Sequence, residues 1–277
     1  FEVDGDPYSS VEDAARRRDF TVNAILQDPL SGEIIDPFDG RRDLEQGTLR
    51  AVDAAHFGED SLRVLRAVQF CARFAMAVQA DTVRICLATP LDDLPRERVW
   101  GEVEKWLLKS AKPSLGLPVA AELGVLARLF PYLETAYARR RAALEATLDA
   151  TATEAADLAW PRRAVLLLAA IGSFLGSRDA ARWLDDLNIH KMRDAHGALD
   201  VRRLVLQLVA ARGRASAWFA DPSRVADRDI RYFSALVEPR LALKLARARG
   251  EGPAADWLQA QLERLAVLDG PPQPLLL

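Results

Sequence analysis

Residues 59–70 read EDSLRVLRAVQF, and this stretch predicts one long helix with two unlike faces. Its apolar residues recur at near-helical spacing and should face a core: Leu62, Leu65, Val68 and Phe70. Asp60 and Arg63 are three residues apart, so we expect their side chains to leave the same face as neighbours. Alone, such a pair is usually an exposed ion pair worth about 0.2–0.5 kcal/mol. Three other stretches of the chain favour a different interpretation.

The composition is that of a soluble globular protein. The chain has 277 residues, of which 50% are apolar and 28% are charged, and its net charge is −3. Binding to nucleic acid would therefore need a local basic face. No run approaches ~20 apolar residues, so we expect no membrane helix and a cytoplasmic protein. Cys71 and Cys86 lie on apolar helical patterns and should be buried thiols, not a disulfide or zinc ligands.

The order of predicted elements is a short α/β segment followed by an all-helical body. Residues 20–27 and 33–36 should form a hairpin around the Asp28-Pro29 turn, and residues 37–43 a loop. Strand signals nearly vanish after Gly58. We expect helices over residues 11–18, 80–88, 96–109, 119–129, 133–150, 162–175, 179–187, 193–211, 225–237, 242–249 and 254–268.

Three further stretches carry charged residues in a suggestive order. Residues 16–24 read RRRDFTVNA, and guanidinium groups hold phosphate oxygens bidentately. Residues 36–44 read DPFDGRRDL, and residues 97–105 read ERVWGEVEK. Taken singly, these are a charged helix end, a turn and a solvated helix face. The ordered set is far more specific than any one of its members.

In order, R-R-D-F-T-x-N-A, D-P-x-x-G-x-x-D-L, E-D-x-x-R-x-L-R-A and E-R-x-x-x-E-x-x-K resemble the motifs of bacterial (class II) tRNA nucleotidyltransferases and poly(A) polymerases, of the CCA-adding enzyme type. The resemblance implies a mostly α fold with a small α/β remnant of a nucleotidyltransferase head. The implied domains are the C-terminal part of the head, a helical neck that recognises the nucleotide base, and a helical RNA-binding body: residues 1–58, 59–112 and 113–277.

The resemblance also implies an activity and its partners. The activity is addition of C, A or both from CTP and ATP to the 3′ end of tRNA, templated by the protein. A poly(A) polymerase, or a non-catalytic remnant that binds RNA or nucleotide, stays open as an alternative. The choice between CCA, CC-only and A-only addition also stays open, because in the family it depends partly on head segments that are not in this sequence.

The resemblance assigns base recognition to Asp60 and Arg63. An acceptor beside a donor matches the pairing edge of C and of A, and it opposes that of U and of G. It assigns binding of the triphosphate and ribose to Arg17, Arg18 and Asp19. It assigns supporting roles to Asp36, Asp39, Asp43, Glu59, Arg66, Glu97, Arg98, Glu102 and Lys105.

One motif of the family is not found in this sequence. It is a glycine-rich turn with a D-x-D strand that holds two Mg²⁺ ions, and in the family it precedes RRDF. Asp4-Gly5-Asp6 lies on no such strand, so we predict no metal ligands here. We expect a missing head segment to bind Mg²⁺, the chain to be a fragment or half of a split enzyme, and this chain alone to transfer no nucleotide.

Basic spots on the predicted body have two interpretations. They are Arg139-Arg140-Arg141, Arg162-Arg163 and Arg202-Arg203. Each could contact phosphates of the tRNA acceptor arm. Each could equally be a solvated helix face, which is what charge runs usually are.

Overall fold

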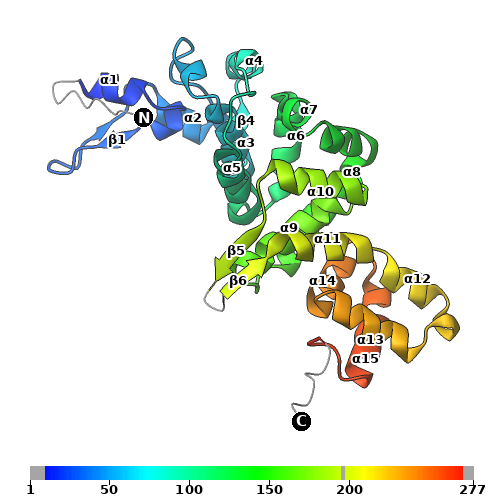
Figure 1. Ribbon diagram of the computed structural model, residues 1–277. Helices are drawn as coiled ribbons and strands as arrows, with labels where there is room; N and C mark the ends of the chain where they lie inside the picture. The colour runs from blue at the N-terminus through cyan, green and yellow to red at the C-terminus, as the bar shows by residue number, and fades with distance from the viewer. Residues whose placement is uncertain (1–9, 195–196, 271–277) are drawn as a thin grey trace. The chain divides into compact units, whose positions relative to one another are not determined.

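The computed structural model describes residues 10–194 and 197–270, so Asp4-Gly5-Asp6 lies outside the described residues (Figure 1). The chain divides into two compact units. Unit 1 is Phe1–Trp106 with Leu115–Leu129, and unit 2 is Leu107–Ser114 with Phe130–Leu277. Apart from one isolated bridge between Phe20 and Ala51, strand pairing in the described residues is confined to three two-stranded sheets, and the rest of the regular structure is helical. The predicted mostly α fold is confirmed.

Unit 1 holds the α/β part of the chain. Its strands are β1 (Leu26–Gln27), β2 (Ile34–Ile35), β3 (Thr48–Leu49) and β4 (Ala77–Val78). Strands β1 and β2 pair antiparallel, which confirms the predicted hairpin. The carboxylate of Asp28 closes the hairpin turn by accepting the N–H groups of Leu30 and Ser31 at 2.7 and 3.1 Å.

Unit 1 also contains several helices, of which α3 is the longest that lies wholly in this unit. They are α1 (Val11–Arg16), α2 (Gly40–Glu45), α3 (Leu62–Phe74), α4 (Ala80–Ala88), α6 (Gly116–Glu122) and α7 (Val125–Leu129), with the 3₁₀ turns η1 (Thr21–Asn23) and η2 (Phe57–Glu59). Helix α5 (Arg96–Lys109) has residues in both units. Helix α3 buries side chains on most of its surface and packs against α6, while β3 and β4, which flank it in sequence, pair in parallel.

Several boundaries predicted for unit 1 are wrong. The helix predicted to start at Glu59 starts at Leu62, because Asp60 has an extended backbone with φ −131° and ψ 97°. Helix α2 begins at Gly40, inside the predicted loop. Of the strand predicted over residues 20–27 only β1 forms, and Thr21–Asn23 is η1, because Asp19 binds the Phe20 N–H and the Asn23 side chain and draws the chain into a turn. Gly124, with φ +68°, divides the helix predicted over residues 119–129.

Unit 2 is built around α9 (Trp160–Gly172). Its other elements are α8 (Pro131–Glu154), α10 (Ser177–Asp186), β5 (Lys191–Asp194), β6 (Gly197–Asp200), α11 (Val201–Ala211), α12 (Arg214–Ala220), η4 (Pro222–Arg224), α13 (Asp227–Leu236), α14 (Pro239–Ala248) and α15 (Gly252–Arg264), with η3 (Pro113–Leu115) at its border. Residues 164–172 of α9 are all buried, and the helix contacts α8, α10, α11 and α14. A helix that is apolar all round belongs in a core.

Two predictions for unit 2 are wrong. The helix predicted from Arg193 starts at Val201, because the preceding residues form the β5–β6 hairpin. Asp200 then caps α11 by accepting the N–H of Arg203 at 3.0 Å. Helix α12 was not predicted at all.

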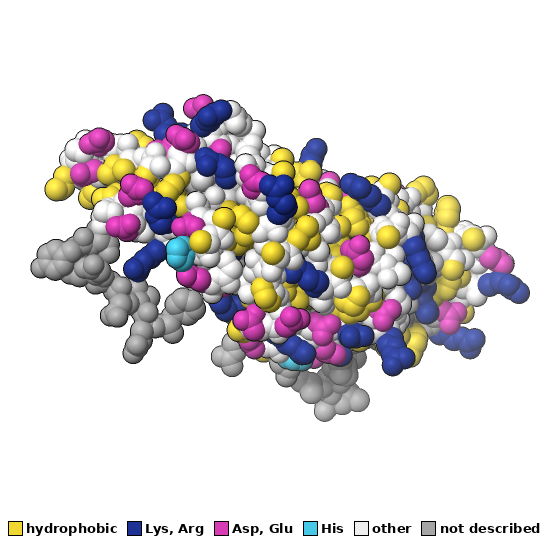
Figure 2. Space-filling view, turned by 90° about the horizontal axis from the view of Figure 1, so that it is seen from above, with side chains coloured by type: hydrophobic (Ala, Val, Ile, Leu, Met, Phe, Trp, Pro, Cys, Tyr) yellow, Lys and Arg dark blue, Asp and Glu magenta, His cyan; other side chains and the backbone are white. Residues whose placement is uncertain are grey.

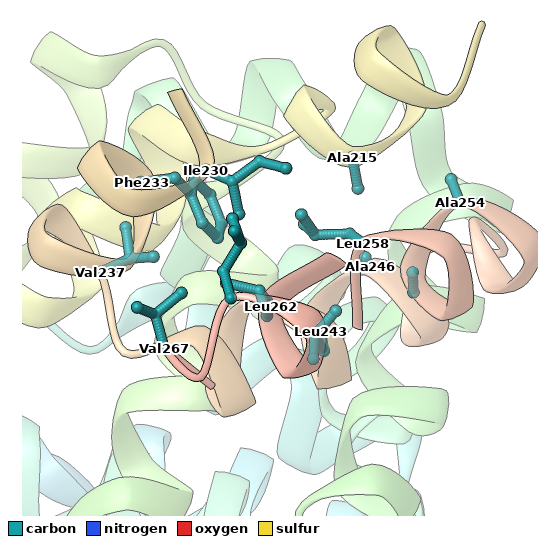
Figure 3. Close-up of a cluster of buried hydrophobic side chains, with 12 residues drawn as sticks. Ala215, Ile230, Phe233, Val237, Leu243, Ala246, Ala254, Leu258, Leu262 and Val267 are labelled. Atoms are coloured by element: carbon teal, nitrogen blue, oxygen red, sulfur yellow. The ribbon is translucent and has the colours of Figure 1, made fainter. Parts of the chain in front are cut away.

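A second apolar cluster joins α12, α13, α14 and α15 (Figure 3). Ile230 and Phe233 of α13 lie beside Leu258 and Leu262 of α15, and all four side chains are at most 4% exposed. The rings of Trp218 and Phe233 meet edge to face, with 5.6 Å between their centroids. This cluster gives the last four helices a core of their own.

The two cysteines are buried free thiols, as predicted. Burial raises the pKa of Cys71 and of Cys86 to about 12. Because a thiolate is the reactive form of cysteine, both side chains are inert at neutral pH.

The surface mixes both signs of charge. On the face in Figure 2, Lys and Arg side chains alternate with Asp and Glu, and no large area carries a single sign. Among the described residues, no helix combines the length and the apolar character that crossing a bilayer requires.

Position 116 requires glycine because the indole of Trp106 lies close to its backbone. A Cβ at Gly116 would lie 2.2 Å from the indole Nε1. We expect Gly116→Ala to lower the free energy of unfolding by about 1–3 kcal/mol, as overpacking of a core does. Gly101→Ala is the control, because a Cβ there meets nothing within 4 Å. It should raise stability by about 0.5–1 kcal/mol. Urea unfolding of both variants checks this, and equal midpoints would contradict it.

Candidate nucleotide-binding site

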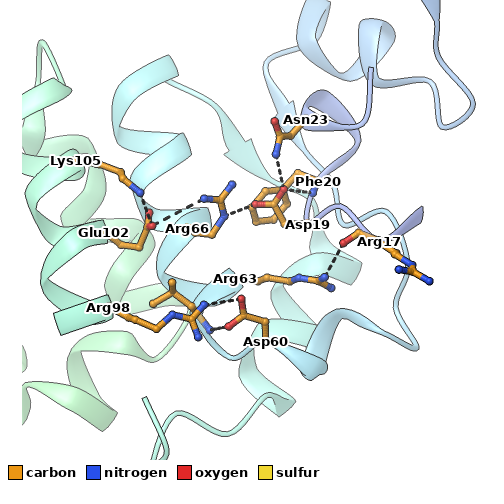
Figure 4. A network of polar contacts seen from close by, with 11 residues as sticks. Arg17, Asp19, Phe20, Asn23, Asp60, Arg63, Arg66, Arg98, Glu102 and Lys105 are labelled. Carbon is orange, nitrogen blue, oxygen red and sulfur yellow. Dashed lines mark hydrogen bonds and ion pairs between the residues drawn. The ribbon is translucent and has the colours of Figure 1, made fainter. Parts of the chain in front are cut away.

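A buried ionic cluster joins three of the four charged motifs (Figure 4). Arg66 of α3 lies between Asp19 and Glu102: its Nε is 2.5 Å from Asp19 Oδ2, and its Nη1 is 3.9 Å from Glu102 Oε1. Lys105 Nζ donates to the same Glu102 oxygen at 2.7 Å. Asp19 is 5% exposed and Glu102 4%. Two carboxylates removed from water need such partners, so Arg66 ties the Asp19 segment to α5.

Asp60 lies just before α3, and its carboxylate is held at both oxygens. Arg98 Nη2 donates to Oδ2 at 2.9 Å, and the Leu62 N–H donates to Oδ1 at 3.2 Å. A quarter of the Asp60 side chain is exposed. Each carboxylate oxygen can accept a further hydrogen bond. The structure therefore leaves Asp60 oriented and open to a ligand.

Arg63 reaches back across the loop that precedes α3. Its Nη2 donates to the Arg17 carbonyl at 2.8 Å (Figure 4). Its Nη1 donates to the His56 carbonyl at 2.9 Å. The guanidinium carbon also lies 5.9 Å from the centroid of the Phe57 ring. Asp60 and Arg63 thus do not pair with each other, although they are close in sequence. Arg63 instead fixes the backbone of the RRD segment beside the start of α3.

The three residues predicted to hold triphosphate and ribose differ in exposure. Arg17 and Arg18 are exposed, whereas Asp19 is buried. Asp19 Oδ1 accepts from the Phe20 N–H and from Asn23 Nδ2, and Oδ2 accepts from Arg66. Of the three, only the arginines are therefore exposed to solvent.

The loop carboxylates fix the segment before β3. Asp36 accepts the N–H groups of Gly40 and Arg41 at 2.8 and 2.9 Å, so it satisfies the start of α2. Asp39 has a left-handed backbone, with φ 57°. Buried Asp43 accepts from Thr21 Oγ1 at 2.5 Å and from Arg50 Nε at 2.8 Å.

Sequence reasoning missed Arg50 and Gly40. Arg50 also donates to the Phe38 carbonyl at 2.7 Å, and so it holds both ends of the loop. A Cβ on Gly40 would lie 2.2 Å from the Thr21 carbonyl oxygen. The DPFDGRRDL stretch offered a signal for Gly40, but Arg50 carries no local pattern that marks it.

The remaining predicted residues lie at the border of the site. Glu59 is exposed in η2, with its carboxylate 4.0 Å from His56 Nε2. Glu97 is exposed in the first turn of α5. The structure brings Asp60, Arg63 and Arg98 together near the Arg17 backbone, and it brings Asp19, Arg66, Glu102 and Lys105 together behind them (Figure 4).

No metal site is found in the part of the chain that the structure describes, since it contains no group of three His, Cys, Asp or Glu side chains placed to share an ion. Asp19 and Asp43 are engaged by arginines. These residues do not fit the two-Mg²⁺ site of the resemblance, so we assign them no metal.

Most arginines of the predicted basic spots are engaged within unit 2. Arg162 makes a bidentate pair with Glu238, and Arg202 makes one with Asp185. Arg141 pairs with Glu145, and Arg140 donates to the Phe174 carbonyl. Arg139 makes no hydrogen bond or ion pair with another described residue, and the side chain of Arg203 is likewise without one. The charge available to a ligand is therefore smaller than the sequence suggests.

Comparison with known proteins identifies the family. A family described as Poly A polymerase head domain matches residues 4–50, and one described as Probable RNA and SrmB- binding site of polymerase A matches residues 86–137. The Multifunctional CCA protein of Xanthomonas campestris pv. campestris (strain B100) is 42% identical over 144 residues, which are 50% of this chain. The match covers 35% of that relative's length, so this chain spans about a third of it.

Solved structures share the fold. The Bacillus stearothermophilus CCA-adding enzyme in complex with CTP superposes with a TM-score of 0.65 and 28% identity, over 94% of this chain and 61% of that one. The Thermotoga maritima CCA-adding enzyme complexed with tRNA_CCA gives 0.63 and 19%, over 94% and 62%. The chain belongs to the CCA-adding enzyme and poly(A) polymerase family of class II nucleotidyltransferases, with residues of the head and RNA-binding domains.

Removing Arg66 should destabilise unit 1. Arg66→Ala leaves Asp19 and Glu102 buried without their shared cation, and we expect it to cost about 3 kcal/mol of folding free energy. Arg63→Ala is the matched control, because it removes an arginine that binds two backbone carbonyls at the surface. It should cost about 1 kcal/mol. Chemical unfolding measures both, and equal losses would show that the ionic cluster has no special role.

Proposed function

We propose that this chain binds CTP and ATP and serves the addition of C, A or both to the 3′ end of tRNA without a nucleic-acid template. The observation that carries the proposal is the grouping of Asp60, Arg63 and Arg98 beside the Arg17 backbone. It sets an oriented carboxylate and a guanidinium beside the segment that carries the exposed Arg17 and Arg18. The CCA protein and the CTP complex among the relatives support the same reaction.

Asp60 and Arg63 would read the base through the polarity of their hydrogen bonds. Asp60 keeps lone pairs that can accept the exocyclic amino group of cytosine or adenine. Arg63 uses two N–H groups on backbone carbonyls and keeps others for the ring acceptor beside that amino group. Uracil and guanine present a carbonyl and a ring N–H in the opposite order. A carboxylate facing a carbonyl is costly, so these bases should be rejected.

The neighbouring residues would hold the rest of the nucleotide. The exposed guanidinium groups of Arg17 and Arg18 would bind triphosphate oxygens. Asp19 Oδ2 accepts from Arg66 and retains a lone pair for a ribose hydroxyl. Arg98 orients Asp60, and Arg66 keeps the Asp19 segment against α5.

The proposed division of labour follows the order of the motifs. Residues 1–58 would be the C-terminal part of the head, residues 59–112 the neck that reads the base, and residues 113–277 the body that binds tRNA. In this division Asp36, Asp39 and Asp43 shape the loop that precedes the neck, and they touch no nucleotide. No transfer step is assigned to Mg²⁺, because the described residues do not provide its ligands.

Poly(A) polymerase is the second candidate, because both matching family descriptions name that enzyme. Such an enzyme extends RNA with A alone, so base choice separates the two. Comparable affinities for CTP and ATP support the CCA-type function, and a strong preference for ATP supports poly(A) synthesis. A chain that binds these nucleotides but serves no transfer would be the non-catalytic remnant.

Base choice should depend on Asp60. In Asp60→Ala the acceptor for the amino group is lost, while Arg63 remains. A good pair of contacts to a base edge is worth about 1–3 kcal/mol of discrimination. We therefore expect the preference for CTP and ATP over UTP and GTP to fall about 10-fold. The measurement is competition of the four nucleotides for binding to this chain, by fluorescence or calorimetry.

Two further variants serve as comparisons for Asp60→Ala. Glu59→Ala removes the adjacent exposed carboxylate and should leave the preference unchanged. Arg98→Ala should lower it by less than Asp60→Ala does, because Asp60 is then present but less well oriented. If Asp60→Ala weakens binding of all four nucleotides equally, Asp60 does not read the base.

A further inference from the structure

A cleft of about 410 Å³ opens in unit 2 between α8 and α10. Its walls include Tyr132, Thr135, Arg139 and Arg140 from α8, with Phe174 and Asp179 opposite. The volume falls in the range of small-ligand sites. Two cations and one carboxylate line it, so its charge favours an anion.

A break in α8 shapes one wall. Arg140 has φ −137° and ψ 35°, which is not helical, although α8 continues on either side. Its Nη2 donates to the Phe174 carbonyl at 2.5 Å, and its guanidinium carbon lies 4.9 Å from the centroid of the Phe174 ring. The contacts hold Arg140 in place and leave other N–H groups of its guanidinium available.

Arg139 is the unpaired partner of that fixed cation. Its side chain is exposed, and it pairs with no other residue that the structure describes. Gly176 is the N-cap of α10 at the cleft, and no side chain caps that helix start. The first-turn N–H groups add a partial positive charge. Asp179 is the opposing charge, and it lies in the same first turn.

Tyr132 and Thr135 supply neutral surface beside the cations. The Tyr132 hydroxyl donates to Asp186 at 2.6 Å, and burial together with this carboxylate raises the Tyr132 pKa, so the ring stays neutral. The Thr135 hydroxyl donates to the Pro131 carbonyl at 3.0 Å and keeps lone pairs to accept from another group. A ribose 2′-hydroxyl is such a donor.

We propose that this cleft binds one phosphodiester of an RNA backbone, with the phosphate on Arg139 and Arg140 and the adjoining ribose against Tyr132 and Thr135. The proposal rests on the proposed function, in which the body contacts tRNA. RNA is favoured as the ligand because the RNA-binding family match extends through residue 137 and so includes the Tyr132 and Thr135 wall. The Arg202-Arg203 spot also sets an unpaired arginine beside a fixed one at a cleft, but it lies outside that family match.

The test is equilibrium binding of labelled tRNA to the full chain over a range of salt concentrations. Arg139→Gln should weaken binding about fivefold at 0.1 M salt and reduce the slope of log K against log[salt] by about 0.7, the loss of one phosphate contact. Arg203→Gln is the control, since it removes one exposed, unpaired arginine of the same unit and should change affinity less than twofold. Thr135→Trp, which obstructs the cleft without changing charge, should also weaken binding.

The outcomes separate this proposal from the proposed function. Failure of the unmodified chain to bind tRNA would overturn both. If Arg139→Gln and Thr135→Trp bind tRNA as tightly as Arg203→Gln does, only the proposal for the cleft is overturned. Inorganic phosphate at matched ionic strength should not displace tRNA. If phosphate does displace tRNA from the unmodified chain but not from Arg139→Gln, the cleft is instead a site for free anions.

Discussion

The guanidinium of Arg66 lies between two buried carboxylates, Asp19 and Glu102, which come from distant parts of the chain. A buried carboxylate without a cation is unfavourable; Asp19 has Arg66, and Glu102 has both Arg66 and Lys105 of its own helix. The shared guanidinium therefore favours packing of the Asp19 segment and of α5 on the same part of α3. Glu102 Oε2 has no hydrogen-bond partner among the described residues, which makes its ion pairs with Arg66 and Lys105 more important.

This constraint explains how the exposed groups are arranged. With Asp19 held inward, Arg17 and Arg18 are left at the surface, and the Arg17 carbonyl is positioned to receive Arg63. With α5 held on α3, Arg98 reaches Asp60. The groups proposed to meet a nucleotide thus owe their positions to groups that do not. Binding-site precision of this kind comes from a packed supporting layer.

In unit 2, by contrast, many charged side chains pair within the unit and are not available to a ligand. Its core around α9 is apolar. Many of its arginines pair with nearby carboxylates, as Arg162 and Arg202 do, or donate to carbonyl groups. Such pairs at a surface contribute little to stability. They do remove charge from the surface, so the number of arginines in the sequence overstates what RNA can contact. The cleft beside Arg139 is informative because one cation there stays unpaired.

The sequence by itself determined the mostly helical fold, the β1–β2 hairpin, the buried cysteines and the charged motifs, because helices and tight turns depend on residues close in the chain. It could not place Asp60 outside α3, start α11 at Val201, or show which arginines are engaged. Asp60 meets Arg98 across 38 residues, and Arg66 meets Asp19 across 47. Local patterns carry no information about such partners. Only the packing of α3, α5 and the RRD segment decided them, because buried charges select the arrangement in which each is paired.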